Sequence, residues 1–568
     1  MWVYASALSG SQVLKRAVVS QWRTVAGSSL LGASHQAGEA MVPVLIGVII
    51  DRAVATGDGG ELISWLLVLA VVFIMLSLSF RFAARTAERA AEQAAHQVRI
   101  QLTERVLDHR GGAESGRLSG ALVNIATEDA KRVGTINMAL PMATAALTAL
   151  LVSAVALLTV SVPLGLLVLL GTPPLLWLAH LLGKPLERRT EIEQERAGHT
   201  SGTAADLVRG LRVLKGIGAE AAAVSRYRRT SQDSLVATLR AARAQAWHNG
   251  TLLALTGIFI AVVALVGGRL AAQGDISIGG LVAAVGLAQF LLTPLTTIAW
   301  VNGEFAQARA SATRVASVLA APAAVVSGNG RLPASVQGRI RLRGVSYGPL
   351  HKIDLDIAAG EMVGVVAPAA AVTALLECLG RDADPVAGSV ELDGISLSEM
   401  HPGDVRAAIL VAAHDADLFE GSLIDNITAA VIGAADNGGV ERALSAAAVD
   451  EVAQSLPHGV HTVIAERGRS LSGGQRQRVA LARALVTNPA VLVVHDPTTA
   501  IDTVTEVRIA AAVREVRRGR TTIMVTTSPA LLAMTDRVVV LDGSIVTAEG
   551  KHADLVGEHE SYRATVLS

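Results

Sequence analysis

Six long apolar stretches constrain this chain more than any other feature of its sequence. A helix that crosses a membrane needs about 20 predominantly apolar residues at a rise of about 1.5 Å per residue. Stretches of that length lie near residues 26–50, 62–80, 138–160, 162–182, 251–272 and 277–301. Only 17% of the 568 residues are charged, against about 25% in soluble domains. The sequence therefore predicts a membrane protein with a bundle of six transmembrane helices, and it argues against a plain soluble enzyme and against disorder.

The distribution of basic residues predicts which ends of the spans face the cytoplasm. Lysine and arginine are dense between spans two and three and between spans four and five, whereas the connections on the other side carry only Arg52 and Arg269. Basic residues stay on the cytoplasmic side. We therefore expect a multi-pass plasma-membrane protein with its N-terminus, both long segments and its C-terminal half in the cytoplasm. Met1–Arg23 has no uninterrupted apolar core with a cleavage pattern after it, so we expect an interfacial amphipathic helix rather than a cleaved signal.

The two long basic segments are expected to be helical. Ala83–His109 and Arg188–Arg243 contain few glycines or prolines, and their apolar residues recur at helical spacing. The membrane helices would then continue into the cytoplasm and turn round at the breaks Gly111–Gly120 and Gly210–Gly218. A solvated charged face is the alternative, and we favour continuous helices because the pattern persists over many turns.

The character of the sequence changes after residue 320. Residues 321–336 are rich in Ala, Gly, Ser and Pro and are predicted to link a transmembrane domain, 1–320, to a second domain, 337–568. Short β-branched runs alternate with helical patterns in the second domain, which predicts an α/β fold with a mostly parallel sheet covered by helices. The expected strands are Ile340–Val345, Met362–Val366, Ile409–Val411, Val491–Val494, Thr521–Val525 and Val538–Leu541.

Net charge and cysteine content argue against two kinds of function. The 49 basic and 49 acidic residues cancel, so nothing favours a nucleic-acid partner. The single cysteine, Cys378, excludes an intrachain disulfide framework and a cysteine-based zinc site. We predict no other resident metal site from the sequence.

The most specific motif of the second domain is Ser472-Gly473-Gly474-Gln475, which leads into a helical pattern. The two glycines allow the backbone to approach an anion closely. A helix that begins here directs its first N–H groups and the positive end of its dipole at that anion, and Ser472 adds a hydroxyl donor. An ordinary serine N-cap is the alternative, which we disfavour because the full string stands shortly before the apolar run Ala490–Val494.

With these motifs the chain resembles an ATP-binding cassette (ABC) exporter half-transporter, in which six transmembrane helices of the type I exporter arrangement are fused to a P-loop-like ATP-binding domain. Ser472–Gln475 matches the signature motif of the family, and Asp496–Asp502 resembles the segment that runs from the catalytic carboxylate to Asp502 of the D-loop. Gly202–Glu220 resembles the second intracellular loop. The resemblance implies transport by a dimer that binds two ATP molecules with Mg²⁺. Each ATP would lie between the phosphate loop of one subunit and the signature motif of the other.

The sequence departs from the family at the phosphate loop, G-x-x-x-x-G-K-[ST], whose amides and lysine hold the phosphates. The matching segment has neither the lysine nor the glycines. The lysine position falls on Thr373 when it is counted from the preceding strand and on Val372 when it is counted back from Asp384-Pro385, and the register stays open. The side chains and the proline of this segment are expected to crowd or remove the amides that phosphate needs. The residues of the degenerate loop are Ala367, Pro368, Ala370, Ala371, Val372 and Thr373.

Four further positions depart from the family on the same nucleotide face. The Q-loop glutamine aligns with His414, the Mg²⁺-linked aspartate with His495, the catalytic glutamate with Asp496, and the switch histidine with Thr527. Imidazole is a poor ligand for Mg²⁺, and withdrawing a catalytic carboxylate by about 1 Å costs on the order of 100-fold in rate. Tyr347 remains as a candidate for stacking on adenine.

The loss of these nucleotide-binding residues, together with the intact signature motif, predicts that this chain and a different subunit contribute different parts of one ATP site. We expect the degenerate-site subunit of a heterodimeric exporter, with no competent catalysis in its own site. Its Ser472–Gln475 would complete the ATP site of a second half-transporter with intact Walker A and B motifs, so that ATP hydrolysis requires both chains. A non-hydrolysing sensor on the same fold and a decayed gene product stay open as alternatives. The sequence argues against a self-sufficient homodimer.

The transported substrate stays open among small molecules, lipids and peptides. His35 and Glu39 lie one helical turn apart on the first span, and ionisable groups at membrane depth usually face a cavity or a pathway. Simple pairing of these two side chains is an equally weighted alternative. Asn137 and Glu304 are weaker candidates near helix ends. Membrane lipids are expected as partners of the spans.

Overall fold

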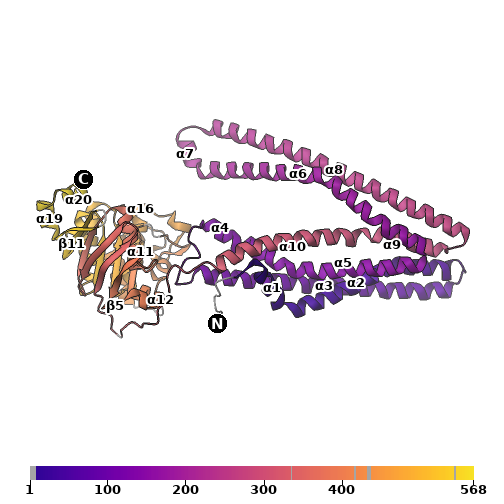
Figure 1. Cartoon of the computed structure of the whole chain (residues 1–568). Helices are drawn as coiled ribbons and strands as arrows, with labels where there is room; N and C mark the ends of the chain where they lie inside the picture. Colours follow the sequence, from indigo (N-terminus) through magenta and orange to yellow (C-terminus); the bar gives the residue numbers. More distant parts are fainter. Residues whose placement is uncertain (1–7, 334, 415–416, 432–436, 543–544, 568) are drawn as a thin grey trace. The chain divides into compact units, whose positions relative to one another are not determined.

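A computed structural model describes residues 8–333, 335–414, 417–431, 437–542 and 545–567 (Figure 1). The chain forms two compact units. The first contains the residues up to Leu102 together with Gly120–Leu319, and the second contains Thr103–Ser119 and the residues from Ala320 onward. Thr103–Ser119, a part of the segment between the second and third predicted spans, therefore belongs to the same unit as the C-terminal domain.

The first unit is helical throughout. Five described helical segments are long and apolar enough to cross a membrane: Gly59–Val106, Ser119–Val160, Val162–Arg209, Glu220–Gln273 and Ile278–Leu319. The remaining predicted span lies in α2 (Trp22–Ile49), a helix of 28 residues that carries the polar side chains of His35, Gln36 and Glu39. The helical membrane fold is confirmed, and the prediction of six spans is not contradicted.

The membrane helices continue well beyond the apolar spans, as the sequence predicts. Helix α3 (Gly59–Val106) runs to the first predicted break. Helices α6 (Val162–Arg209) and α8 (Glu220–Gln273) lie side by side and are joined through the short α7 (Leu211–Gly216) (Figure 1). The N-terminal helix α1 (Gly10–Ser20) buries Val13 and Ala17 and exposes the opposite face, which is the expected amphipathic pattern.

Close backbone contacts and one ion pair hold the remaining helices of this unit together. Helix α2 meets α9 (Ile278–Phe290) so closely that a Cβ added at Gly47 would lie 2.4 Å from the Gly279 carbonyl oxygen. The buried Asp129, which precedes α5 (Ala130–Val160), accepts a 2.6 Å hydrogen bond from Arg314 of α10 (Leu292–Leu319) and a 2.8 Å bond from Ser311. The bonds of Arg314 and Ser311 to Asp129 link α10 to the start of α5.

The second unit is built on a parallel sheet. Its six strands have the order β12-β11-β3-β10-β9-β6, and only β12 is antiparallel to its neighbour. Strands β3, β9, β10 and β11 are almost wholly buried, because helices cover both faces of such a sheet, whereas the edge strand β12 is partly exposed. Their bounds are β3 Met362–Val366, β6 Ile409–Ala412, β9 Val491–His495, β10 Thr521–Val525, β11 Arg537–Asp542 and β12 Ile545–Gly550. The prediction of an α/β domain with a mostly parallel sheet is confirmed.

A second, antiparallel sheet of order β2-β1-β4-β5 packs beside it. Of its strands, only β1 (Ile340–Tyr347) is predicted from the sequence. The others are β2 Leu350–Ile357, β4 Ala387–Leu392 and β5 Ile395–Ser396. The helices that matter for the site are α11 (Ala369–Leu379), α16 (Gly473–Val486) and α17 (Thr503–Val516).

Candidate nucleotide-binding site

The carboxyl ends of four parallel strands bring the predicted site residues to one edge of the sheet. Ala367 follows β3, His414 follows β6, His495 ends β9 and Thr527 follows β10. In open α/β sheets this edge is where ligands bind. The arrangement gathers on one face the positions that the sequence predicted to be degenerate.

The connection between β3 and α11 is too short to form a phosphate cradle. Strand β3 ends at Val366 and helix α11 begins at Ala369, with Pro368 as its N-cap. The backbone N–H groups of Ala371 and Val372 both donate to the Pro368 carbonyl, at 2.9 and 3.0 Å. These two N–H groups are therefore used inside the helix and do not point at a ligand.

Burial distinguishes the two possible lysine positions. Val372 is 4% exposed and belongs to the core of the domain, whereas Thr373 is exposed. The Thr373 hydroxyl donates back to the Ala369 carbonyl, 3.1 Å away. Neither side chain supplies a cation to this edge of the sheet.

The two histidines lie against each other and against Asp496. The ring centroids of His414 and His495 are 5.7 Å apart, and the His414 Nδ1 is 3.3 Å from the Asp496 carbonyl oxygen. The Asp496 Oδ2 is 3.6 Å from the His495 Nε2, while its Oδ1 is buried with no hydrogen-bond partner among the described residues. The Asp496 carboxylate is thus turned toward an imidazole.

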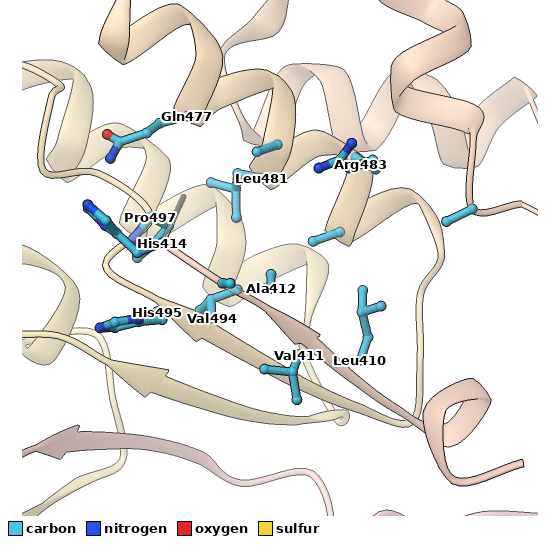
Figure 2. A pocket seen from close by; sticks show the side chains of 14 residues that line it. Leu410, Val411, Ala412, His414, Gln477, Leu481, Arg483, Val494, His495 and Pro497 are labelled. Carbon is cyan, nitrogen blue, oxygen red and sulfur yellow. The ribbon is translucent and has the colours of Figure 1, made fainter. Parts of the chain in front are cut away.

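Figure 2 shows both rings beside a cavity of about 230 Å³ between β6, β9 and α16. Its walls are mainly aliphatic, and the guanidinium of Arg483 lies at a distance from the rings. Arg483 donates to the Asp417 carbonyl at 3.1 Å, and burial lowers the pKa of its guanidinium. Among the described residues, no group of three or more His, Cys, Asp or Glu side chains is arranged to hold a metal ion.

Tyr347 ends β1 immediately before the tight turn at Gly348, whose φ of 55° favours glycine. A hydrogen bond to the Glu377 carboxylate of α11 raises the pKa of the Tyr347 phenol. The ring also packs on the edge of the domain core. These contacts hold the side chain against the last turn of α11, and its role in adenine stacking stays a prediction.

Thr527 lies in the loop after β10 and is exposed. Glu506 of α17, which no sequence motif singled out, joins this loop to the segment after Asp496. The Glu506 Oε1 accepts from the Ser528 hydroxyl at 2.8 Å and from the Thr498 hydroxyl at 2.6 Å.

The signature motif forms the N-terminus of α16. The Ser472 Oγ accepts from the Gln475 amide at 3.3 Å, and the Gln475 Oε1 accepts from the Ser472 amide at 2.8 Å, which together form a capping box. Ser472 is therefore an N-cap, as the alternative interpretation of the motif proposed. The bond uses a lone pair of the hydroxyl oxygen, so its proton can still be donated outward.

Helix α16 also fixes the segment that leads to the D-loop. The Gln477 side chain donates to the Thr499 hydroxyl at 2.7 Å and accepts from the Ala500 amide at 2.8 Å. A Cβ added at Gly474 would lie 2.5 Å from the Ala500 carbonyl oxygen. Asp502 then caps α17 by accepting from the Thr505 amide at 3.0 Å, a bond that lowers the pKa of its carboxyl. Sequence reasoning missed Gln477, although it lies in the same string as the signature.

The residues of this chain do not fit Mg²⁺·ATP at the end of β3. A triphosphate needs several amides and a cation, and this edge offers a helix that starts at once, a proline and apolar side chains. Magnesium needs hard oxygen ligands, and the described residues bring together here two imidazoles and the Asp496 carboxylate, which is turned toward one of them. The signature side differs, since Ser472 and the first amides of α16 suit an anion.

In the first unit, the two candidate substrate-site residues contact each other, and one of them borders a cavity. The His35 Nε2 lies 3.6 Å from the Glu39 Oε2. His35 lines a cavity of about 240 Å³, and Glu39 is absent from its wall. Asn137 is buried and bonds the Gly134 carbonyl at 3.2 Å.

Comparison with known proteins agrees with this fold. A family model for the ABC transporter transmembrane region matches residues 27–295, and a model for the ABC transporter matches residues 350–499. An ATP-dependent lipid A-core flippase of Thiobacillus denitrificans is 30% identical over 407 residues, which cover 70% of each protein. This chain belongs to the ABC transporter family.

Further relatives of this ABC transporter chain differ in length. A multidrug efflux ATP-binding/permease protein of Mycobacterium tuberculosis is 31% identical over 509 residues, which cover 88% of this chain and 42% of that protein. The chain thus spans about two-fifths of that relative. A solved bacterial Atm1-family ABC exporter with ATP bound is 23% identical, with a TM-score of 0.76 over 97% of this chain and 99% of the other. That likeness shows the exporter fold. The family match over the transmembrane region and the five apolar helices show a multi-pass membrane protein. Its nucleotide-binding unit follows the transmembrane region in the sequence, which is consistent with the cytoplasmic side of the membrane.

Proposed function

We propose that this ABC chain is one subunit of an ATP-driven exporter and that it works as the degenerate half of a heterodimer. The observation that carries the proposal is the contrast between its two nucleotide faces. At the end of β3 a helix begins directly after Pro368, without a lysine. On α16 the signature motif is intact and its serine is oriented by a capping box.

In this proposal the chain acts on the nucleotide held by another subunit. The Ser472 hydroxyl and the first amides of α16 would contact the phosphates of an ATP bound to the phosphate loop of that subunit, which must have intact Walker A and B motifs. Gln477 would keep the D-loop segment at a fixed distance from the signature through its bonds to Thr499 and Ala500. ATP hydrolysis is then a property of the pair.

The names of the relatives support export but leave the substrate open. One relative is named for multidrug efflux and another for flipping the lipid A core. More than half of the multidrug efflux protein lies outside the match, which leaves room in that polypeptide for a second half. For this chain we propose a small molecule, a lipid or a peptide as cargo.

Two other functions make different predictions. A self-sufficient homodimer would place the loop around Ala367–Thr373 at both of its sites, which argues against it. A non-hydrolysing sensor on the same fold would need no competent partner, and the intact signature helix disfavours it.

The test is ATP turnover by the chain purified alone and together with a half-transporter that has an intact phosphate loop. We expect no turnover alone, and turnover in the pair that falls about 100-fold in Ser472→Ala, as for loss of one transition-state donor. Ser422→Ala is the matched control, because Ser422 forms the same capping box on α13 (Leu423–Thr428), away from the signature. Turnover by the chain alone would contradict the proposal, and so would equal losses in the two variants.

A further inference from the structure

The segment between β9 and α17 contains a turn that a side chain of α17 itself closes. The Ile501 amide donates to the Thr498 carbonyl at 3.0 Å, and Asp502 then caps the helix. Glu506 lies one helical turn further on, and its Oε1 accepts from the Thr498 hydroxyl at 2.6 Å. Thr498 is 2% exposed, and a buried hydroxyl almost always has a hydrogen-bond partner. Among the described residues, that partner is Glu506.

The same carboxylate oxygen also holds the loop after β10. The Ser528 hydroxyl donates to the Glu506 Oε1 at 2.8 Å, and the Ser528 amide donates to the hydroxyl of the buried Thr526 at 3.1 Å. This loop leaves a strand that has a neighbour on each side in the six-stranded sheet. Glu506 therefore fastens the turn before α17 to the central part of the sheet.

The other side of the turn is fastened to the signature helix. Gln477 of α16 bonds the Thr499 hydroxyl and the Ala500 amide, and Gly474 leaves no room for a Cβ beside the Ala500 carbonyl. The turn is thus held at neighbouring residues from two sides, by Glu506 and by α16. Loss of Glu506 would leave only the support from α16.

We propose that Glu506 is a positioning residue for ATP hydrolysis at the site that this chain completes for another subunit. The carboxylate is used by two hydroxyls of its own chain, so it would act through the turn and not on the nucleotide. It would keep Asp502 at a fixed distance from Ser472 of the signature motif. Displacement of such a group by about 1 Å costs on the order of 100-fold in rate. The inference rests on the proposed function.

The first arm of the test measures hydrogen–deuterium exchange in the full chain alone, without ATP. Glu506→Ala should raise the exchange rate of the Ala500 and Ile501 amides at least about 10-fold, because the turn opens more easily once one support is lost. Glu506→Gln keeps an acceptor oxygen in the same place and should stay within about 3-fold of the wild type.

Glu361→Ala is the matched control. Glu361 is also partly buried, and its carboxylate also accepts two hydrogen bonds, from Arg537 and from the Ala358 amide, at the amino end of β3. This variant should leave the exchange of the turn before α17 unchanged, because Glu361 lies at the opposite edge of the sheet from that turn.

The second arm measures ATP turnover by the pair, with the rate referred to folded protein. Glu506→Ala should lower kcat about 10- to 100-fold and leave KM for ATP within about 2-fold. Glu506→Gln should recover most of kcat, and Glu361→Ala should change neither constant.

Unchanged exchange at Ala500 and Ile501 in Glu506→Ala would overturn the inference, and so would equal losses of kcat in Glu506→Ala and Glu361→Ala. The two proposals fail differently. A wild-type pair without turnover would overturn the proposed function and this inference with it. Turnover that is present in the wild type and unchanged in Glu506→Ala would overturn this inference alone.

Discussion

Replacing Gly474 by alanine should loosen the nucleotide-binding unit, whereas the same change at Gly473 should not. The new Cβ at 474 would lie 2.5 Å from the Ala500 carbonyl oxygen, so the backbone there must move about 0.9 Å to reach the ordinary contact distance of 3.4 Å. At 473 the new Cβ would lie 3.3 Å from the Ala500 side chain, a methyl group that can yield.

The cost can be worked from these contacts. Overpacking of this kind costs about 1–3 kcal/mol. Movement of Ala500 also weakens the two hydrogen bonds of Gln477, at about 1 kcal/mol each. We expect Gly474→Ala to lose about 2–4 kcal/mol of unfolding free energy, which lowers the Tm of a domain of this size by roughly 5–15 °C. Gly473→Ala should stay within about 1 kcal/mol, helped by the smaller entropy of its unfolded chain.

The assay is thermal unfolding of the full chain in detergent, followed by near-UV circular dichroism or by scanning fluorimetry. Thermal stability is measured rather than ATP turnover, because an alanine at either position would also obstruct the phosphates of ATP bound to another subunit. Equal melting temperatures for the two variants would contradict this prediction, since they would show that Gly474 does not lie close to the Ala500 carbonyl.

Three further outcomes follow from the same unit. Glu377→Gln should lower the pKa of Tyr347 toward its usual value near 10, because the carboxylate no longer holds the phenol proton; ultraviolet titration at alkaline pH of the variant and the wild type checks this. The Arg110 guanidinium holds the pKa of Asp108 at about 2, so its ionised form stabilises the fold above about pH 4, and this stabilisation is lost as the pH falls through about 4 toward 2; melting curves of Asp108→Asn should show less of that acid loss. Thr373→Lys alone should not create nucleotide binding, because the helix still begins directly after Pro368; saturable ATP binding by this variant would show that charge alone was missing.

Much of the fold follows from the sequence because the parallel strands are buried on both faces. Runs such as Val491–Val494 are continuous apolar segments, and each predicted strand is observed. The antiparallel sheet is harder to predict, although Leu350–Ile357 does alternate between buried and exposed residues. Helix α2 holds the predicted span 26–50, and it carries the polar side chains of His35, Gln36 and Glu39 within that stretch.

The candidate site was predicted in its composition but not in its geometry. Residue types alone identify the missing lysine and the altered carboxylate, and the strand ends then bring those positions together. The start of α11 at Ala369 was not predicted, because the resemblance to the family placed a loop there, although the run of alanines after Pro368 favours a helix. The contacts of Gln477 and Glu506 join segments that only the tertiary structure brings together.

The most direct test of the proposed degenerate site is equilibrium binding of radiolabelled Mg²⁺·ATP to the chain purified without any other subunit. We expect no saturable binding below about 1 mM, because the end of β3 offers neither a cation nor a cradle of amides. The binding free energy would then be weaker than about −4 kcal/mol. Saturable binding in the micromolar range that is lost in Thr373→Glu would place the nucleotide at the start of α11 and contradict it.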